Sequence, residues 1–396
     1  MASRKRNGGS GFVFVIGFML ASLGAAPAAR AQESLDAALQ PYLAKYELPA
    51  LSAAVFRDGK IIAVGAVGTR RAGAAIPVTR DDRFHLGSDT KAMTSLMAGM
   101  LVEASQLRWD TTIVEVFPEL APKMDAKLAK VTLEQLLSHT GGIPPDDASI
   151  EALVAKSLVQ PGNLDSMRYW LVGELVQQPL AFAPGTDWKY SNMGYVIAGA
   201  ILERKTGRSW EELVTERVFE PLGLTTAGIG PQASMGRIDA PLAHDQKDGK
   251  LVPMLAGPNG DVPPTMAPAG AAHMSVLDFA RWSAWNAGEG QRGPALVKPE
   301  TLKKLHTPVI AMTHDKPAPG TPPSGRYALG WGEVTLDWTP EPFVFHGGSN
   351  TMNLAYVLFQ PARDYGMVLM TNVGGEKADA GLKALVKELD TRYAQR

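Results

Sequence analysis

Cysteine is missing from all 396 residues of this chain. Its absence excludes a cysteine nucleophile, a zinc finger, an iron–sulfur cluster and a disulfide scaffold. Neither sign of charge dominates, because 39 Lys and Arg residues stand against 40 Asp and Glu residues, and no basic stripe indicates a nucleic-acid partner. With 40 Gly and 29 Pro the chain is not of low complexity, and a hydrophobic content of 45% allows a large core.

The one long apolar stretch lies near the N-terminus, which excludes a polytopic membrane protein. A basic segment, residues 4–6, precedes an uncharged apolar run over residues 11–26, and small residues follow up to Ala31. This run is shorter than the roughly 20 residues that span a bilayer, so it indicates a signal peptide rather than an anchor. We therefore expect cleavage after Ala31 and a periplasmic or secreted mature protein without a stable membrane anchor.

Strand and helix patterns divide the mature chain into two ends and a middle. Residues 51–68 contain two β runs around a hairpin signal, and residues 343–371 contain three more. Residues 90–103 and 378–393 have helical composition or spacing. From about residue 130 to about residue 300, the pattern indicates helices and long loops. Six Pro and four Gly over residues 241–270 predict no regular element there.

This order of patterns predicts an α+β fold. An antiparallel sheet built from both chain ends is flanked by helices, and a mainly helical domain is inserted between the ends. The expected sheet domain comprises residues 32–90 and 315–396. The expected helical domain, with long loops, comprises residues 91–314.

Ser88 and Lys91 form the first candidate catalytic pair, at the junction between a β run and a helix. Residues three apart share one helix face, so the Lys91 amine can reach the Ser88 hydroxyl. A serine hydroxyl needs a base to become a nucleophile, and a neutral lysine in a water-poor cleft can be that base. The Ser88 N–H can also stabilise an oxyanion. The alternative is an N-capping serine beside a solvated lysine.

A second candidate group contains Tyr190 and Asn192, in a loop after a Pro-Gly pair. Tyr190 can pass a proton between nucleophile and leaving group. Asn192 can contact both a lysine ammonium and a substrate amide, because its side chain donates and accepts hydrogen bonds. The alternative is a turn with a buried tyrosine.

The third candidate group is His346, Gly347, Gly348 and Ser349, between two β runs. Glycines allow a substrate to approach a strand edge closely. The N–H of Ser349 can serve as a second oxyanion donor. The alternative is a Gly-rich hairpin.

Other motifs favour structural roles. The mature chain lacks G-x-S-x-G, H-E-x-x-H and a Walker loop, and its seven histidines do not cluster at metal spacing, so we expect no metal and no cofactor. The G-x-G-x-x-G at residues 288–293 follows a helix-like stretch and is expected to be a surface turn. The acid pairs at residues 81–82 and 146–147 are expected to be solvated loop residues, and His85 and His139 packed structural ones.

The order and spacing of the three candidate groups resemble the serine β-lactamase and penicillin-binding superfamily. The similarity is strongest to the branch of class C β-lactamases, D-alanyl-D-alanine peptidases and related serine esterases, and it spans nearly the whole mature chain. It also includes residues 136–142 (LLSHTGG), 268–270 (PAG), 274–281 (MSVLDFAR) and 327–331 (YALGW). The resemblance implies an antiparallel sheet flanked by helices, a helical domain, and a cleft between them.

The resemblance also implies a role for each candidate. Ser88 is the acylated nucleophile, Lys91 its base, and Tyr190 shares the proton transfer. Asn192 contacts the substrate, and the N–H groups of Ser88 and Ser349 form the oxyanion hole. The expected partner is a small-molecule or peptide substrate, and the oligomeric state is left open.

Two departures from the family pattern bear on the substrate. Tyr190-x-Asn192 replaces the Ser-Asp-Asn of class A enzymes, and His346 stands where class C lactamases carry a permanently charged lysine. We therefore expect an exported serine hydrolase that cleaves an ester or an amide, including D-amino-acid peptides. The alternatives are a class C-like β-lactamase and a slowly turning over penicillin-binding sensor. Whether Arg281 or Arg326 supplies a cation instead is left open.

Overall fold

The computed structural model describes residues 1, 8, 32–255, 257, 260–313 and 317–395. Except for Met1 and Gly8, the expected signal peptide lies outside these described residues. Within the same ranges, none of the helices has the length and apolar character needed to cross a bilayer. Gln32–Arg396 form one compact unit.

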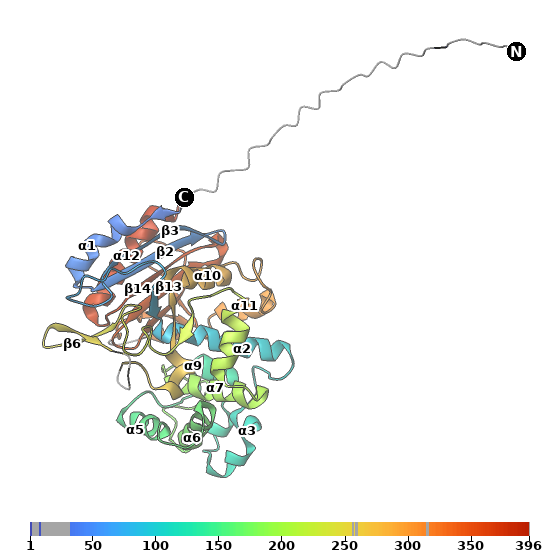
Figure 1. Cartoon of the computed structure of the whole chain (residues 1–396). Coiled ribbons are helices and arrows are strands. Elements are labelled where there is room, and N and C mark those ends of the chain that lie inside the picture. Colours follow the sequence, from blue (N-terminus) through green and yellow to red (C-terminus); the bar gives the residue numbers. More distant parts are fainter. Residues whose placement is uncertain (2–7, 9–31, 256, 258–259, 314–316, 396) are drawn as a thin grey trace. The chain divides into compact units, whose positions relative to one another are not determined.

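Nine strands in the described part of the chain form the central sheet, and they come from both chain ends (Figure 1). Neighbouring strands run antiparallel, except that β1 and β3 are parallel. In spatial order the strands are β1 (Glu33–Ser34), β3 (Lys60–Gly68), β2 (Ala50–Arg57), β14 (Tyr365–Thr371), β13 (Leu354–Gln360), β12 (Phe343–Ser349), β11 (Gly332–Val334), β10 (Ser324–Tyr327) and β9 (Ile310–Thr313). The predicted antiparallel sheet with flanking helices is confirmed.

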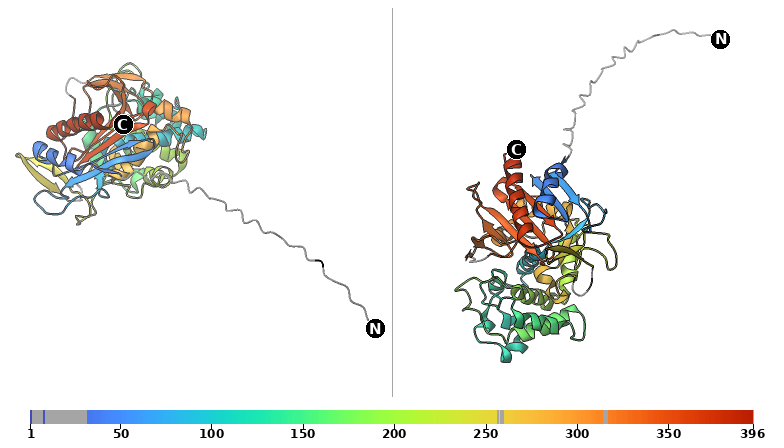
Figure 2. Two further views of the ribbon diagram at one scale, coloured as in Figure 1. Left: turned by 90° about the horizontal axis from the view of Figure 1, so that it is seen from above. Right: turned by 90° about the vertical axis from the view of Figure 1, so that its left-hand side faces the viewer.

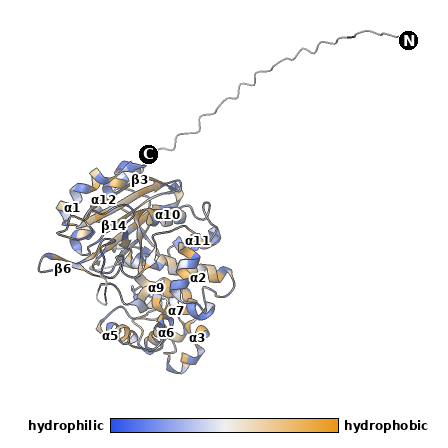
Figure 3. Ribbon diagram, viewed as in Figure 1, coloured by the Kyte–Doolittle hydropathy of each residue, from blue (hydrophilic) through white to orange (hydrophobic). Residues whose placement is uncertain are grey.

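Helices cover both faces of this sheet, which explains why every residue of β13 and β14 is buried. On one face lie α1 (Asp36–Tyr46) and α12 (Glu376–Tyr393), side by side in Figures 1 and 2. On the other face lies α10 (Val276–Ala287). In Figure 3 the central strands are coloured largely as apolar, as expected for strands between two helical layers.

Most of the remaining helices form a second region beneath the sheet in Figure 1, whereas α11 (Pro299–His306) lies next to α10. Two of them, α2 and α7, are buried along most of their length because they are apolar on all sides. The remaining helices are α2 (Thr90–Glu103), α3 (Ile113–Val116), α4 (Leu133–Leu137), α5 (Ala148–Ser157), α6 (Leu164–Leu175), α7 (Asn192–Thr206), α8 (Trp210–Val214), α9 (Ala267–Gly270) and α11 (Pro299–His306).

Two small sheets lie outside the central sheet. The first contains β4 (Arg83–His85), β8 (Ala272–Ser275) and β5 (Gly228–Ile229). The second is a hairpin of β6 (Ala243–Lys247) and β7 (Lys250–Met254).

The prediction that residues 241–270 contain no regular element is wrong. The hairpin of β6 and β7 turns at Asp248 and Gly249, which have φ angles of 50° and 71°. Asp-Gly is a strong hairpin signal, and Pro253 is tolerated because a two-stranded sheet leaves each strand an open edge. By contrast, residues 288–293 form the expected turn, which is buried at residue 288 and exposed from residue 291 onward.

The predicted split of residues 32–396 into a sheet domain and a helical domain remains a prediction. Two elements that it assigns to the helical part belong with the sheet: α10 packs on the sheet, and β9 pairs with β10. The nucleophile candidate lies between the two regions, in the 3-10 turn Gly87–Asp89 that joins β4 to α2.

Candidate active site

The turn that carries Ser88 is packed tightly against β12. Gly87 has a φ of +53°, and a Cβ on Gly87 would lie 2.4 Å from the backbone nitrogen of Ser349. A Cβ on Gly348 would lie 1.8 Å from the carbonyl oxygen of Leu86 and 2.8 Å from the Ser88 nitrogen. Only glycine permits such an approach of two backbones. The two glycines therefore bring the N–H groups of Ser88 and Ser349 to one place.

Lys91 is fully buried and has three hydrogen-bond partners. Its Nζ lies 3.0 Å from Ser88 Oγ, 2.6 Å from Asn192 Oδ1 and 2.7 Å from the Ala269 carbonyl oxygen. The last two atoms can only accept, so a neutral amine donates its two protons to them and turns its lone pair toward the Ser88 hydroxyl. This is the arrangement that a general base for Ser88 requires.

The neutral amine is accessible near neutral pH. Burial lowers the pKa of Lys91 to about 7, against the field of Asp146, which raises it. Asn192 connects this carboxylate to the lysine, because its Nδ2 donates to Asp146 while its Oδ1 accepts from Lys91. A lysine can only donate and a carboxylate only accepts, so these partners fix the orientation of the Asn192 amide.

Tyr190 lies against both members of the pair. It forms a side-chain hydrogen bond with Ser88, and Lys91 Nζ is 4.8 Å from the centre of its ring. Burial raises the pKa of Tyr190 above its usual range, so the hydroxyl keeps its proton. A protonated phenol beside the nucleophile can donate a proton to a leaving group and recover it from Lys91.

The ring of His139 packs against the ring of Tyr190. The two ring centres are 4.3 Å apart, and His139 Nδ1 accepts the Ser191 N–H at 3.2 Å. Burial lowers the pKa of His139 well below its usual range. His139 therefore has the packed structural role that was expected of it.

The second half of β12 has an open edge in the described part of the chain. Strand β11 pairs with Phe343–Phe345 only, which leaves the edge of His346–Ser349 that faces away from β13 without a strand partner. A small pocket beside this edge is lined by Ser88, Asn192, Val262, Met266, Ala269, Gly270 and Ser349. The sequence-predicted residues of all three motifs thus meet at one place.

His346 is buried, and both of its ring nitrogens face protein groups. Nδ1 lies 3.2 Å from Asp89 Oδ1, and Nε2 lies 3.1 Å from the Tyr327 hydroxyl. Burial, followed by the nearby Lys91 charge, lowers the pKa of His346 to about 3, against an opposing hydrogen bond with the Gly347 backbone. The imidazole is therefore neutral at physiological pH.

A second pocket, lined in part by aromatic rings, adjoins His346. It is lined by Trp188, Tyr190, Met312, Gly320, Thr321, Pro322, Tyr327, Gly332, Phe345, His346 and Gly347. Among the described residues lining this pocket or the Ser88 pocket, none is lysine or arginine. Arg281 pairs instead with Asp278, and Arg326 lies 3.6 Å from Glu333. Neither of these arginines lines the two pockets.

The acid pairs at residues 81–82 and 146–147 were expected to be solvated loop residues. This expectation is wrong for Asp82, and for Asp146 it misses a contact with the site. Asp82 is buried and lies 2.6 Å from Arg70 Nη2. Asp146 is exposed but accepts from Asn192, whereas Asp147 caps α5. No signal in the sequence places Asp146 near Lys91, because the contact joins a loop to a helix that begins 46 residues later.

His85 is a buried strand residue, as expected, but it also stabilises the nucleophile turn. Its Nδ1 accepts the Gly87 N–H at 3.0 Å, and its Nε2 lies 2.8 Å from Asp261 Oδ1.

Three site residues received no role from sequence reasoning: Asp89, Ala269 and Tyr327. The only signal for Asp89 is its position within the serine–lysine motif. Among the described residues, no group of three or more His, Asp or Glu could hold a metal ion.

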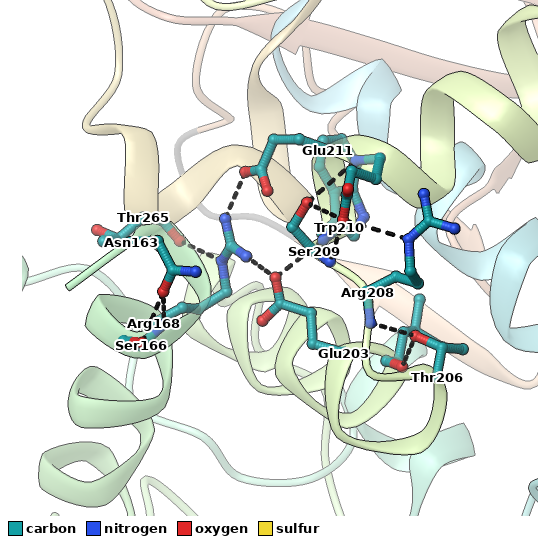
Figure 4. A network of polar contacts seen from close by, with 12 residues as sticks. Asn163, Ser166, Arg168, Glu203, Thr206, Arg208, Ser209, Trp210, Glu211 and Thr265 are labelled. Atoms are coloured by element: carbon teal, nitrogen blue, oxygen red, sulfur yellow. Dashed lines mark hydrogen bonds and ion pairs between the residues drawn. The ribbon is translucent and has the colours of Figure 1, made fainter.

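A buried ion-pair network supports the segment that carries Ala269 (Figure 4). Arg168 is fully buried, contacts Glu203 and Glu211, and donates to the Thr265 carbonyl at 3.1 Å. This network joins α6, α7 and α8 to the chain immediately before α9. The Ala269 carbonyl, which accepts from Lys91, follows four residues after Thr265.

Comparison with known proteins identifies the family of this chain. The family model described as Beta-lactamase matches residues 35–391, so the chain belongs to the Beta-lactamase family, within the serine β-lactamase and penicillin-binding superfamily of hydrolases. A curated relative is penicillin-binding protein 4 of Amycolatopsis lactamdurans. It is 28% identical over 339 residues, which cover 83% of this chain and 82% of the relative.

Solved structures show the same fold. The octameric penicillin-binding protein homologue from Pyrococcus abyssi has a TM-score of 0.71 at 24% identity, covering 89% of this chain and 76% of that chain. The D-stereospecific amidohydrolase from Streptomyces sp. has a TM-score of 0.65 at 23% identity, covering 88% of this chain and 96% of that chain. The predicted family and fold are thereby confirmed.

Proposed function

We propose that this protein is an exported serine hydrolase that cleaves an ester or amide bond through an acyl-enzyme on Ser88. The observation that carries the proposal is the buried Lys91 amine, 3.0 Å from Ser88 Oγ and with a pKa lowered to about 7. A lysine in that state is a base at neutral pH, and a serine with such a base is a nucleophile. Export rests on the signal-peptide pattern of residues 1–31.

The proposed reaction has two halves. In the first, Ser88 Oγ bonds to the substrate carbonyl carbon while its proton passes to Lys91. The N–H groups of Ser88 and Ser349 stabilise the oxyanion, and the bond to the leaving group then breaks as that group takes a proton through Tyr190. In the second, water attacks the acyl-enzyme, the acid product leaves, and Ser88 regains its proton.

The pockets favour an uncharged substrate. Described residues lining the two pockets include no lysine or arginine, and His346 is neutral. A substrate carboxylate would therefore lack the charge-assisted hydrogen bond that gives such groups their affinity. We propose small neutral esters and amides as substrates, including amides of D-amino acids and D-amino-acid peptides whose C-terminal carboxyl group is blocked. The relation to the Streptomyces amidohydrolase supports this class.

Covalent labelling tests the proposal directly. A fluorophosphonate should add one adduct mass to the peptide that contains Ser88, and Ser88→Ala should abolish the adduct. Equal labelling of Ser88→Ala would refute the assignment. Rates on a short-chain ester, a D-Ala-D-Ala peptide and a chromogenic cephalosporin, measured side by side, then decide among the rivals. Fast cephalosporin turnover identifies a lactamase, and a stable adduct without turnover identifies a sensor.

His346 provides a test of substrate charge. We expect the wild type to hydrolyse neutral esters and to turn over penicillins and cephalosporins poorly. His346→Lys adds a permanent charge and should raise the ratio of lactam to ester activity roughly tenfold, because charge-assisted hydrogen bonds are about twice as strong as neutral ones. His346→Gln is the neutral control. An equal rise in both variants, or efficient cephalosporin turnover by the wild type, would contradict the reasoning.

A further inference from the structure

Asp89, which directly follows the nucleophile, is an unusual carboxyl group. It is buried, and it immediately precedes α2, yet its side chain accepts no hydrogen bond from the N–H groups of that helix. A carboxylate at this position ordinarily accepts such bonds and gains from the helix dipole. The side chain turns instead to His346 Nδ1, 3.2 Å from its Oδ1.

The partners of the two ring nitrogens of His346 decide where its proton lies. Tyr195 donates its only proton to the Leu137 carbonyl at 2.5 Å, because a carbonyl can only accept. The Tyr327 hydroxyl lies 3.1 Å from His346 Nε2 and can accept a proton carried on that nitrogen.

The position of that proton is linked to the state of Asp89. A neutral imidazole with its proton on Nε2 has a bare Nδ1, which can only accept. The atom that faces Nδ1 is Asp89 Oδ1, so in this tautomer that oxygen carries the proton. We propose that Asp89 is a neutral carboxylic acid that donates to His346 Nδ1, and that its neutrality leaves Lys91 free to act as a base. The second part rests on the proposed function, whereas the first does not.

The ionic alternative is an imidazolium paired with a carboxylate. It would place two charges at positions where the side chains of His346 and Asp89 are 5% and 1% exposed, at a high cost in desolvation. It would also put the imidazolium near Lys91, and it would leave a charged Asp89 Oδ2 without a donor among the described residues. Burial accordingly raises the pKa of Asp89 well above its usual range, although Lys91 opposes this rise.

The consequence for catalysis follows from the surroundings of Asp89. An ionised Asp89 would stabilise the ammonium form of Lys91 and weaken it as a base, whereas a neutral acid exerts no such field. Asp89 is therefore a positioning residue that acts through its protonation state. The titratable groups that face it come from α2, β12, β13, β10 and the loop before α7: Lys91, His346, Tyr356, Tyr327 and Tyr190.

The first test is the pH dependence of fluorophosphonate labelling in Asp89→Asn. Asparagine is neutral and can donate to His346 Nδ1 as the acid does. We expect the midpoint of the acidic limb to stay within about 0.3 pH units of the wild type, whatever happens to the plateau rate. If Asp89 is ionised in the wild type, its removal lowers the midpoint by about one unit or more. Asp146→Asn is the matched control, since it removes a carboxylate that raises the pKa of Lys91, and it should lower the midpoint.

The second test needs no activity. In ¹⁵N-histidine-labelled wild type, with the His346 signals assigned through His346→Gln, Nε2 should be coupled to a proton and Nδ1 should resonate as an unprotonated nitrogen from about pH 5 to about pH 8. An imidazolium signal, or a proton on Nδ1, would overturn the proposal. A chain that shows the expected signals but takes up no fluorophosphonate would refute the proposed function and leave the neutral acid standing.

Discussion

Acidification should switch off the acylation of Ser88, because a protonated Lys91 has no lone pair for the serine proton. Burial lowers the pKa of Lys91 to about 7, whereas that of a free lysine is about 10.4. At pH 7 roughly half of the protein should therefore hold a neutral amine, against roughly one molecule in a few thousand for a free lysine. The active fraction should then fall about tenfold for each further pH unit below the midpoint.

The second-order rate of fluorophosphonate labelling measures this fraction without knowledge of the natural substrate. We expect a plateau above about pH 8, a midpoint near the Lys91 pKa, and a rate at pH 5 of about one hundredth of the plateau. The free enzyme sets this profile, since the probe reacts with unliganded protein.

Lys91→Arg is the control for this experiment. Arginine keeps a cation in the site but does not lose its proton, so it cannot act as the base. The variant should label at least a thousandfold more slowly at every pH, and heating curves should show that it is folded. A wild-type rate that is constant between about pH 5 and about pH 7, or a midpoint close to that of a free lysine, would refute the reasoning.

Three further predictions concern the proton relay, the glycine contacts and the leader. Lys91→Ala and Tyr190→Phe should each slow acylation by several orders of magnitude, and the double variant little more than the slower single one; fully additive losses would show independent roles. Gly348→Ala should lower the free energy of unfolding by about 3 kcal/mol, because its Cβ would lie 1.8 Å from a carbonyl oxygen. Gly173→Ala, in α6 with its nearest contact at 3.9 Å, should change it by no more than about 1 kcal/mol, and in the stabilising direction. Equal unfolding curves would contradict the close contact. Mass spectrometry of the exported protein should find residue 32 at the N-terminus, and an intact N-terminus in the membrane fraction would favour an anchor.

Much of this molecule could be predicted because the deciding interactions are local. Ser88 and Lys91 are three residues apart at the start of a helix, so their contact follows from helix geometry. The three C-terminal strands over residues 343–371 were predicted because they are uninterrupted apolar runs between turn residues.

The site contacts that were missed join distant parts of the chain. The Ala269 carbonyl that accepts from Lys91 is 178 residues away in sequence. His346 and Asp89 are 257 residues apart, and no pattern of residue types predicts their contact. From the ordinary pKa of histidine, the sequence predicts that His346 is neutral over much of the physiological pH range. Burial is the stronger cause of this neutrality, because it lowers the pKa of His346 to about 3. Burial depends on the tertiary structure, which spacing alone does not supply.

The surroundings of Lys91 fit both of the protonation states that the proposed reaction needs. As a neutral amine, Lys91 donates to Asn192 Oδ1 and the Ala269 carbonyl and accepts from the Ser88 hydroxyl. As an ammonium, it donates to the same three groups, because the acylated Ser88 oxygen has lost its proton. No partner must move as the charge appears, and Asp146, which contacts Asn192, stabilises that charge. A fixed set of acceptors of this kind lowers the cost of reorganisation during proton transfer. Loss of the Asn192 amide should therefore slow acylation even when the Lys91 pKa is unchanged.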